Sequence, residues 1–175
     1  MNAIPLFIVL ALLSSCAAPP KVIQDKEIQG FGGVKLGETL ADAKAALEHD
    51  GIFYKFTGRA LDYESVANGE RWYISAELTK TRISSILLVT RPYIPGMSQI
   101  VVPFTECDRR FDNALETLRK EYGDDPRDAS PDGSGTTDYT WFLKNRSVTL
   151  RRHKSDEGCD SLSILYADNA IADHL

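Results

Sequence analysis

The chain has few of the residues that mark specialised classes of protein. Three cysteines in 175 residues are too few for a small domain held by several disulfides. With 43% hydrophobic and 26% charged residues, it is neither a polar disordered chain nor a multispan membrane protein. It has no excess of basic residues, since 20 Lys and Arg face 25 Asp and Glu, a formal net charge of -5. This balance argues against binding to nucleic-acid phosphates, so we expect one compact domain and no nucleic-acid partner.

A long hydrophobic run is also lacking. Residues 4–13 form an uncharged apolar stretch, too short for a helix that crosses a hydrocarbon core of about 30 Å. The stretch is typical of the hydrophobic segment of a signal peptide. It continues into Leu13-Ser14-Ser15-Cys16 and then Ala17-Ala18-Pro19-Pro20. This sequence resembles a bacterial lipobox.

The lipobox resemblance implies a lipid anchor. Residues 1–15 would be a lipoprotein signal peptide, Cys16 would carry the lipid, and residues 16–30 would form the lipidated N-terminus and a flexible tether. Ala17 behind Cys16 implies the outer membrane, with the domain facing the periplasm of a bacterial envelope. Two or three acyl chains make such an anchor effectively permanent. The alternatives are an ordinary cleaved signal peptide with an incidental Cys16, and a single anchoring helix.

Export bears on the other two cysteines. Cys107 and Cys159 would lie in an oxidising compartment, where a remaining pair forms a disulfide more often than it stays reduced. The alternative is two buried free cysteines. A redox-active pair is disfavoured because the C-x-x-C spacing is absent. We therefore predict a Cys107–Cys159 disulfide.

The patterning of residues 31–175 repeats itself. A helix is predicted from Thr39-Leu40-Ala41-Asp42, a start like a capping box, to Gly51. Residues 52–56, 72–78 and 83–90 read as strands, with a loop at residues 57–70. After a Pro-rich boundary, Thr105-Glu106-Cys107-Asp108 predicts a second helix that ends at Gly123. Strands at residues 139–143, 148–150 and 162–166 follow it.

These elements predict an α+β domain made of two similar halves, residues 31–90 and 104–168. Each half would be a helix plus an antiparallel three-stranded meander, with the helices packed on one face of the sheet. Alternation in the strands predicts that the other sheet face is at least partly wet. Aromatic side chains on that face, such as Tyr73 and Phe142, are candidates for a protein-contact patch, although packing beneath a loop is an alternative.

A family resemblance points in the same direction. Residues 33–40, Gly-Val-Lys-Leu-Gly-Glu-Thr-Leu, are similar to the entry into the first helix of SmpA/OmlA-type outer-membrane lipoproteins. The tandem order of helix and sheet resembles the β-lactamase-inhibitor-protein-like superfamily. The resemblance implies a non-enzymatic module that binds proteins through a sheet face and its loops.

Sites for chemistry are sparse in the sequence. No G-x-S-x-G motif is present, and His49, His153 and His174 have no second ligand at metal spacing, so no catalytic residue, cofactor or metal site is predicted. Asp128-x-Ser130-x-Asp132-Gly133 resembles half of a calcium loop, but position twelve is Tyr139, which favours an ordinary acidic turn. The basic residues 151–154 suggest a solvated hairpin end or, alternatively, a surface for anionic groups.

We therefore expect a lipid-anchored bacterial envelope lipoprotein that acts as a protein-binding or accessory module and not as an enzyme. Its partners would be the membrane, through Cys16, and an envelope protein. The alternative is an inhibitor of an envelope or secreted hydrolase. A hydrolase whose site assembles from scattered residues is a third hypothesis.

Overall fold

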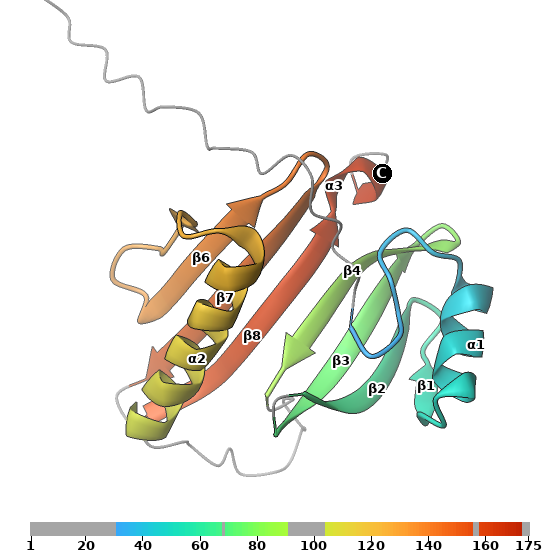
Figure 1. Cartoon of the computed structure of the whole chain (residues 1–175), viewed down its shortest axis with the longest axis horizontal. Helices are drawn as coiled ribbons and strands as arrows, with labels where there is room; N and C mark the ends of the chain where they lie inside the picture. The colour runs from blue at the N-terminus through green and yellow to red at the C-terminus, as the bar shows by residue number, and fades with distance from the viewer. Residues whose placement is uncertain (1–30, 68, 91–103, 156–157, 173–175) are drawn as a thin grey trace, which may run out of the picture.

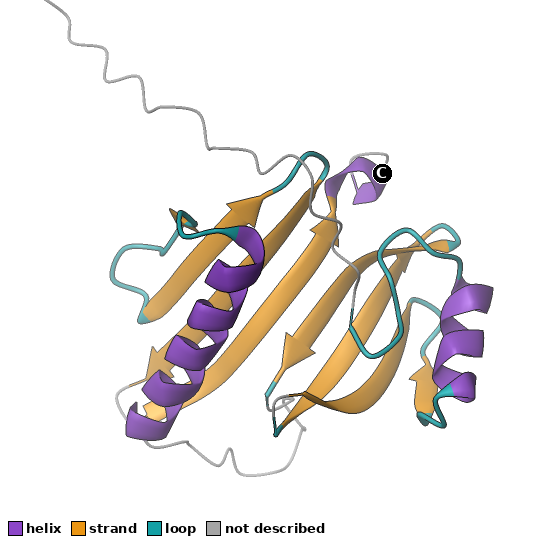
Figure 2. Cartoon of the chain, in the orientation of Figure 1, coloured by secondary structure: helices purple, strands orange, loops and turns teal. Residues whose placement is uncertain are grey.

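The computed structural model describes residues 31–67, 69–90, 104–155 and 158–172 of the chain. Within these residues every strand belongs to a single antiparallel sheet of eight strands (Figure 2). The helices are α1 (Leu40–His49), α2 (Phe104–Tyr122) and α3 (Asn169–Ala172). The strands are β1 (Tyr54–Phe56), β2 (Ala60–Ala67), β3 (Glu70–Thr79), β4 (Arg82–Val89), β5 (Arg127–Asp128), β6 (Thr136–Phe142), β7 (Arg146–Ser155) and β8 (Gly158–Asp168).

The strand order is β1-β2-β3-β4-β8-β7-β6-β5, so each half of the chain supplies four neighbouring strands in sequence order. The last strands of the two halves, β4 and β8, pair at the centre of the sheet. Their ladder runs from Ser85 opposite Ala167 to Val89 opposite Ser163. Hydrogen bonds between β4 and β8 therefore join two four-stranded antiparallel units into one sheet.

Residues 31–39 explain how α1 is placed. Gly37 adopts a φ of +84°, which favours glycine, and its N–H donates to the carbonyl of Ile83 over 2.8 Å. Arg82 donates to the Gly37 carbonyl over 2.6 Å, which fixes the segment on the β3–β4 hairpin. The Thr39 hydroxyl then accepts the N–H of Asp42, as the capping pattern predicts, and Gly51 follows the helix with a φ of +67°.

The helices cover the sheet incompletely. In Figure 1, α2 lies in front of β7 and β8, and the segment before α1 lies on the same side of the sheet. At the other end of the sheet, the Tyr54 hydroxyl of β1 donates to Glu48 of α1 over 2.7 Å. Neither α1 nor α2 lies over β3 and β4, so these two strands have no cover from the longer helices.

The core lies between the sheet and these elements. The face that contacts α2, here called the helix face, contributes Trp72, Ile74, Ile86, Leu88, Val148, Leu150, Leu162, Ile164 and Tyr166. Leu47 from α1 and Phe111 and Leu118 from α2 are buried in the same cluster. Because residues from both halves share this cluster, neither half has a core of its own.

The predicted fold class is wrong. The structure is not two three-stranded meanders with helices packed over one face, but one eight-stranded sheet with few, short helices. The predicted loop at residues 57–70 contains β2, where buried Leu61 and Tyr63 alternate with the more exposed Asp62 and Glu64. Because Asp62 and Glu64 are charged, this segment resembles a polar loop in the sequence. The pairing of β4 with β8 is distant in sequence and has no local signal.

A matched pair of substitutions in β4 tests this placement. Leu88 is fully buried at the β4–β8 ladder, whereas its neighbour Leu87 points to the opposite, partly exposed face. We expect Leu88→Ala to lower the free energy of unfolding in urea by about 2–5 kcal/mol. Leu87→Ala should cost about 1 kcal/mol or less. Equal losses from the two variants would contradict the assigned faces of β4.

Candidate functional site

The sheet face opposite α2, here called the open face, carries four adjacent apolar side chains at its centre. Tyr73 of β3 lies opposite Val89 of β4, and Leu87 of β4 lies opposite Leu165 of β8. Because Leu87 and Val89 are two residues apart on one strand, all four are neighbours on one face. We call Tyr73, Leu87, Val89 and Leu165 the apolar patch; Leu165 is 37% exposed and the other three are partly buried.

A groove of about 890 Å³ extends from the apolar patch toward β1. Phe53, which precedes β1, lines the groove and is 97% exposed. Residues of the turn before β1 and of β1, β2, β3 and β4 form the rest of its lining. A groove lined by the almost fully exposed Phe53 and the partly exposed Tyr73 is typical of an interaction surface.

The border of the patch and groove is acidic. Three carboxylates lie on this face: Asp62 and Glu64 of β2 and Glu77 of β3. Two cations lie on the same face: Lys55 of β1 and Arg71 of β3. Ser75 donates to Asp62 over 2.7 Å, Ser85 donates to Glu77 over 3.1 Å, and Arg71 pairs with Glu64 at 3.2 Å. With three carboxylates and two cations, this part of the open face has a formal charge of -1.

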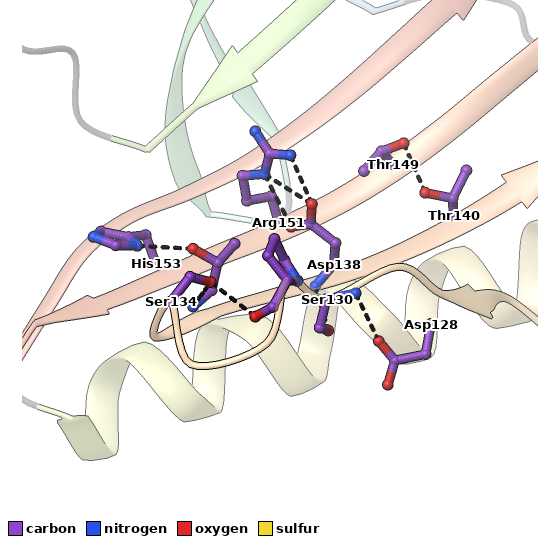
Figure 3. A network of polar contacts seen from close by, with 10 residues as sticks. Asp128, Ser130, Ser134, Asp138, Thr140, Thr149, Arg151 and His153 are labelled. Carbon is purple, nitrogen blue, oxygen red and sulfur yellow. Dashed lines mark hydrogen bonds and ion pairs between the residues drawn. The ribbon is translucent and has the colours of Figure 1, made fainter.

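The other half of the open face is polar and internally paired (Figure 3). Arg151 donates to the buried carboxylate of Asp138 over distances of 2.6, 2.9 and 3.1 Å. This carboxylate raises the pKa of Arg151. The hydroxyls of Thr140 and Thr149 lie 3.0 Å apart and hydrogen bond to each other. Because these polar groups already have partners, the apolar patch is the better contact surface.

A second concavity lies on the helix face, between α2 and the first half of the chain. It has a volume of about 600 Å³, and its floor includes Trp72, Ile164 and Tyr166. Residues of α2 from Arg109 to Tyr122 form one wall. We call this concavity the interhalf cleft. It exists because α2 does not extend over β3 and β4.

The interhalf cleft has a network of ion pairs at one end. Glu106 accepts hydrogen bonds from Arg109 and Arg110 over 2.7–2.9 Å, and these bonds lower the pKa of Glu106 to about 2. Glu70, from the β2–β3 hairpin, lies 3.7 Å from Arg109 and 3.5 Å from Arg110. The network thus links α2 to the first half of the chain.

At the other end of the cleft the hydroxyl groups are buried. Burial raises the pKa of Tyr122 and of Tyr166, and the carboxylate of Glu121 raises both further. Both phenols are neutral at physiological pH, as an ordinary tyrosine is. Neutral phenols in this position serve packing and hydrogen bonding.

The predicted cysteine sites are only partly described. Cys16 lies outside the described residues. Cys107, in the first turns of α2, is 2% exposed and disulfide-bonded. The backbone of Cys159 lies in β8 opposite Lys154, but its side chain is outside the described residues. The Cys107–Cys159 pairing therefore stays a prediction.

The other predicted residues are dispersed. His49 lies 3.0 Å from Asp50, His153 hydrogen bonds to Thr136, and His174 falls outside the described residues. In the described part of the chain, no three His, Cys, Asp or Glu side chains are grouped as metal ligands.

The calcium-like segment forms the turn between β5 and β6. Asp128 accepts the N–H of Ser130 over 2.9 Å, and the Ser130 hydroxyl accepts the N–H of Asp138 over 3.0 Å (Figure 3). Hydrogen bonds from the side chain and the backbone N–H of Ser130 lower the pKa of Asp128. Two of the oxygens that the motif would offer to a cation therefore hold the turn onto β6.

The basic residues 151–154 lie in the last part of β7, the strand that pairs with β8 up to Ser155 opposite Gly158. Strand alternation places Arg151 on the open face, whereas Arg152 points to the helix face, 4.2 Å from the centre of the Phe111 ring. Lys154 lies 2.7 Å from the Asp108 carboxylate of α2. The basic residues are thus divided between two faces and do not form one cationic surface.

Sequence reasoning found only part of the candidate surface. Tyr73 and Phe142 both lie on the open face, as their strand positions predict, and Tyr73 belongs to the apolar patch. Leu87, Val89 and Leu165 were missed, because only the pairing of β4 with β8 shows that they are neighbours. The full exposure of Phe53 has no sequence signal.

The chain matches no protein-family model, no curated protein and no solved structure. Within the described residues, no helix is long and apolar enough to cross a membrane.

The ion pairs of the cleft predict a pH dependence. Because the folded pKa of Glu106 lies below the ordinary value of 4.5, its charge stabilises the folded protein above pH 4.5, and this contribution is lost as the pH falls through about 2. In an NMR titration of the side-chain carboxyl carbon we expect a midpoint near 2.

Substitution of the arginines provides the control for this titration. Arg109→Gln should raise the Glu106 midpoint toward 4.5, because it removes the hydrogen bond with the largest effect. Arg119→Gln, at an exposed position elsewhere on α2, should leave the midpoint unchanged. A midpoint near 4.5 in the unsubstituted protein would contradict the pairing.

Proposed function

We propose that this protein is a lipid-anchored lipoprotein of a bacterial envelope, and that it acts as a non-enzymatic module that binds another envelope protein. The apolar patch on the open face carries the proposal. It places one tyrosine and three aliphatic side chains at the centre of an eight-stranded sheet, with polar and charged groups around them. An apolar centre with an aromatic anchor and a polar rim is the usual anatomy of a protein–protein interface.

The partner proposed for this surface is a protein with its own apolar patch bordered by Lys and Arg. The acidic border around the patch, with Asp62, Glu64 and Glu77 against two cations, favours such a partner over an acidic one. A rigid sheet also loses little conformational entropy on binding, since its side chains are already held by the strands.

The lipid anchor would restrict the search for that partner to the membrane surface. The lipobox-like residues 13–16 support this part of the proposal. With Cys16 as the anchored residue, residues 17–30 would connect the membrane anchor to the described residues, which begin at Phe31.

Mass spectrometry of membrane-extracted protein tests the anchor. We expect a mature chain that begins at Cys16 and carries a thioether-linked diacylglyceryl group and an acylated amine. The Cys16→Ser variant should keep residues 1–15 or lose the lipid. An unmodified Cys16 still preceded by residues 1–15 would overturn the anchor.

Digestion of the same sample without reductant should also yield one cross-linked peptide that contains Cys107 and Cys159.

Site-specific photo-crosslinking tests the docking surface. A photoreactive phenylalanine at position 53 or 165 should capture the same envelope protein in intact cells, because both positions border the open face. The matched control is position 119, exposed on α2 and away from that face.

The captured protein must then bind in purified form. Tyr73→Ala should weaken its affinity by about 30-fold, the effect of losing a central aromatic anchor worth about 2 kcal/mol. Asp62→Asn with Glu64→Gln should slow association and reduce its salt dependence. Capture of the same protein from position 119, or an affinity unchanged by Tyr73→Ala, would reject the open face as the docking surface.

A further inference from the structure

One row of paired residues crosses five neighbouring strands of the open face, with β4 in the middle. Each residue of the row lies opposite the next in the strand ladders, in the order Glu64, Tyr73, Val89, Ser163 and Arg151. Val89 of β4 is therefore the central residue of the row. Its ends are an acidic side chain on β2 and a basic side chain on β7, each two strands away from β4.

The adjacent row of the open face follows the same order of strands. It consists of Asp62, Ser75, Leu87, Leu165 and Thr149. Its central residue, Leu87, belongs to the apolar patch, as Val89 does. The apolar patch thus lies at the middle of both rows, and its carboxylate border is confined to one side of β4.

Both ends of the first row have hydrogen-bonding groups to spare. Asp138 accepts from Nε and Nη2 of Arg151 (Figure 3), and Nη1 donates to no other residue in the described part of the chain. The Arg151 side chain is 54% exposed. Glu64 pairs with Arg71 through Oε2 alone, and its side chain is 50% exposed. Each end group can therefore take a further partner without losing the one that it has.

The two sides of the open face also carry opposite formal charge. The side chains of β1–β3 on this face sum to -1. On β5–β7 the charged side chains of this face are Arg127 and Arg151 against Asp138, which gives +1. A surface with an apolar centre and oppositely charged sides is complementary to a copy of itself turned by 180°.

We propose that the open face docks onto the open face of a second copy of this chain, around a two-fold axis that runs along β4. This inference rests on the proposed function and names the partner of its docking surface. Rotation about that axis exchanges positions that lie equally far from β4 in the same row. Glu64 of one copy would face Arg151 of the second copy, and Leu87 would face its own equivalent. A two-fold axis across the strands would bring the two acidic sides together instead, so the charges favour the axis along β4.

The dimensions of the face are compatible with this dimer. Two sheets can pack face to face, about 10 Å apart, with their strands nearly aligned. Five strands about 4.8 Å apart and about eight residues long present about 600 Å² per copy. The total of about 1,200 Å² is at the lower end of the range for stable, specific interfaces.

The dimer would also give a partner to the exposed ring of Phe53. This residue is 97% exposed and lines the same groove as Glu64. In the proposed arrangement its ring would lie close to the guanidinium of Arg151 of the second copy. Aromatic rings and guanidinium groups attract each other in such contacts.

Substitutions at the axis provide a direct test. Self-association of the full chain with Cys16→Ser is measured by sedimentation equilibrium, and circular dichroism checks that each variant is folded. We expect a reversible dimer that Leu87→Glu and Leu87→Lys each weaken by about 30-fold, because two like charges would face each other. A mixture of the two Leu87 variants should restore the dimer, because each introduced carboxylate then faces an introduced amine.

Leu165 provides the matched control for the axis. It is adjacent to Leu87 in the apolar patch, but it would face Ser75 of the second copy. A mixture of Leu165→Glu with Leu165→Lys should therefore restore much less dimer. Glu64→Lys should weaken association by about tenfold. Asp112→Lys, the same change of charge at an exposed position of α2, should leave it unchanged.

Cross-linking separates this inference from the docking proposal. In a mixture of isotope-labelled and unlabelled protein, a photoreactive phenylalanine at position 165 should attach to β3 of the other copy, near Ser75. A protein that stays monomeric, while positions 53 and 165 capture a different envelope protein in cells, would overturn the inference and leave the docking proposal intact. A dimer that the Leu87 variants do not weaken would also overturn the inference, because another surface would then hold it together. A monomer with no capture from either position would reject both.

Discussion

The antiparallel ladder between β4 and β8 is the interaction on which the rest of the structure depends. It joins the last strand of one half to the last strand of the other, 72 residues away at the contact between Thr90 and Leu162. Without it, each half would be a separate four-stranded sheet, and its share of the core would lose its contacts with the other half. With it, the side chains of both halves form one core.

The same ladder creates both candidate surfaces. Successive side chains of β4 and β8 point to opposite faces, so Leu88 and Ile164 belong to the core, whereas Leu87 and Leu165 belong to the apolar patch. The apolar patch and the floor of the interhalf cleft thus lie back to back at the centre of the sheet. The floor of the cleft is uncovered because α2 does not extend over β3 and β4, whereas the apolar patch lies on the sheet face opposite α2.

Short-range features of the fold could be predicted from the sequence. Thr39 caps α1, and Gly51 and Gly123 follow the ends of the two longer helices in left-handed conformations, because capping and glycine preferences act within a few residues. Alternation in β3 correctly separated Trp72 from Tyr73. Thr105 shows the limit of such signals, since α2 begins at Phe104 and not after a capping threonine.

Long-range features could not be predicted. β2 was missed because Asp62 and Glu64 occupy its open-face positions, so that its sequence resembles a loop. Neither the apolar patch nor the interhalf cleft has a motif, since each is assembled from strands and helices far apart in the chain. The functional proposals therefore rest on pairing that only the structure provides.

Native-state hydrogen exchange in increasing urea is the most direct measurement of the central claim that the two halves form one cooperative sheet. The account predicts that amides in the β4–β8 ladder exchange only through global unfolding. The most protected amides of β2–β3 and of β6–β7 should converge on the same free energy. Exchange of one half at a distinctly lower free energy, while the other half stays protected, would show that the ladder does not couple them and would contradict the account.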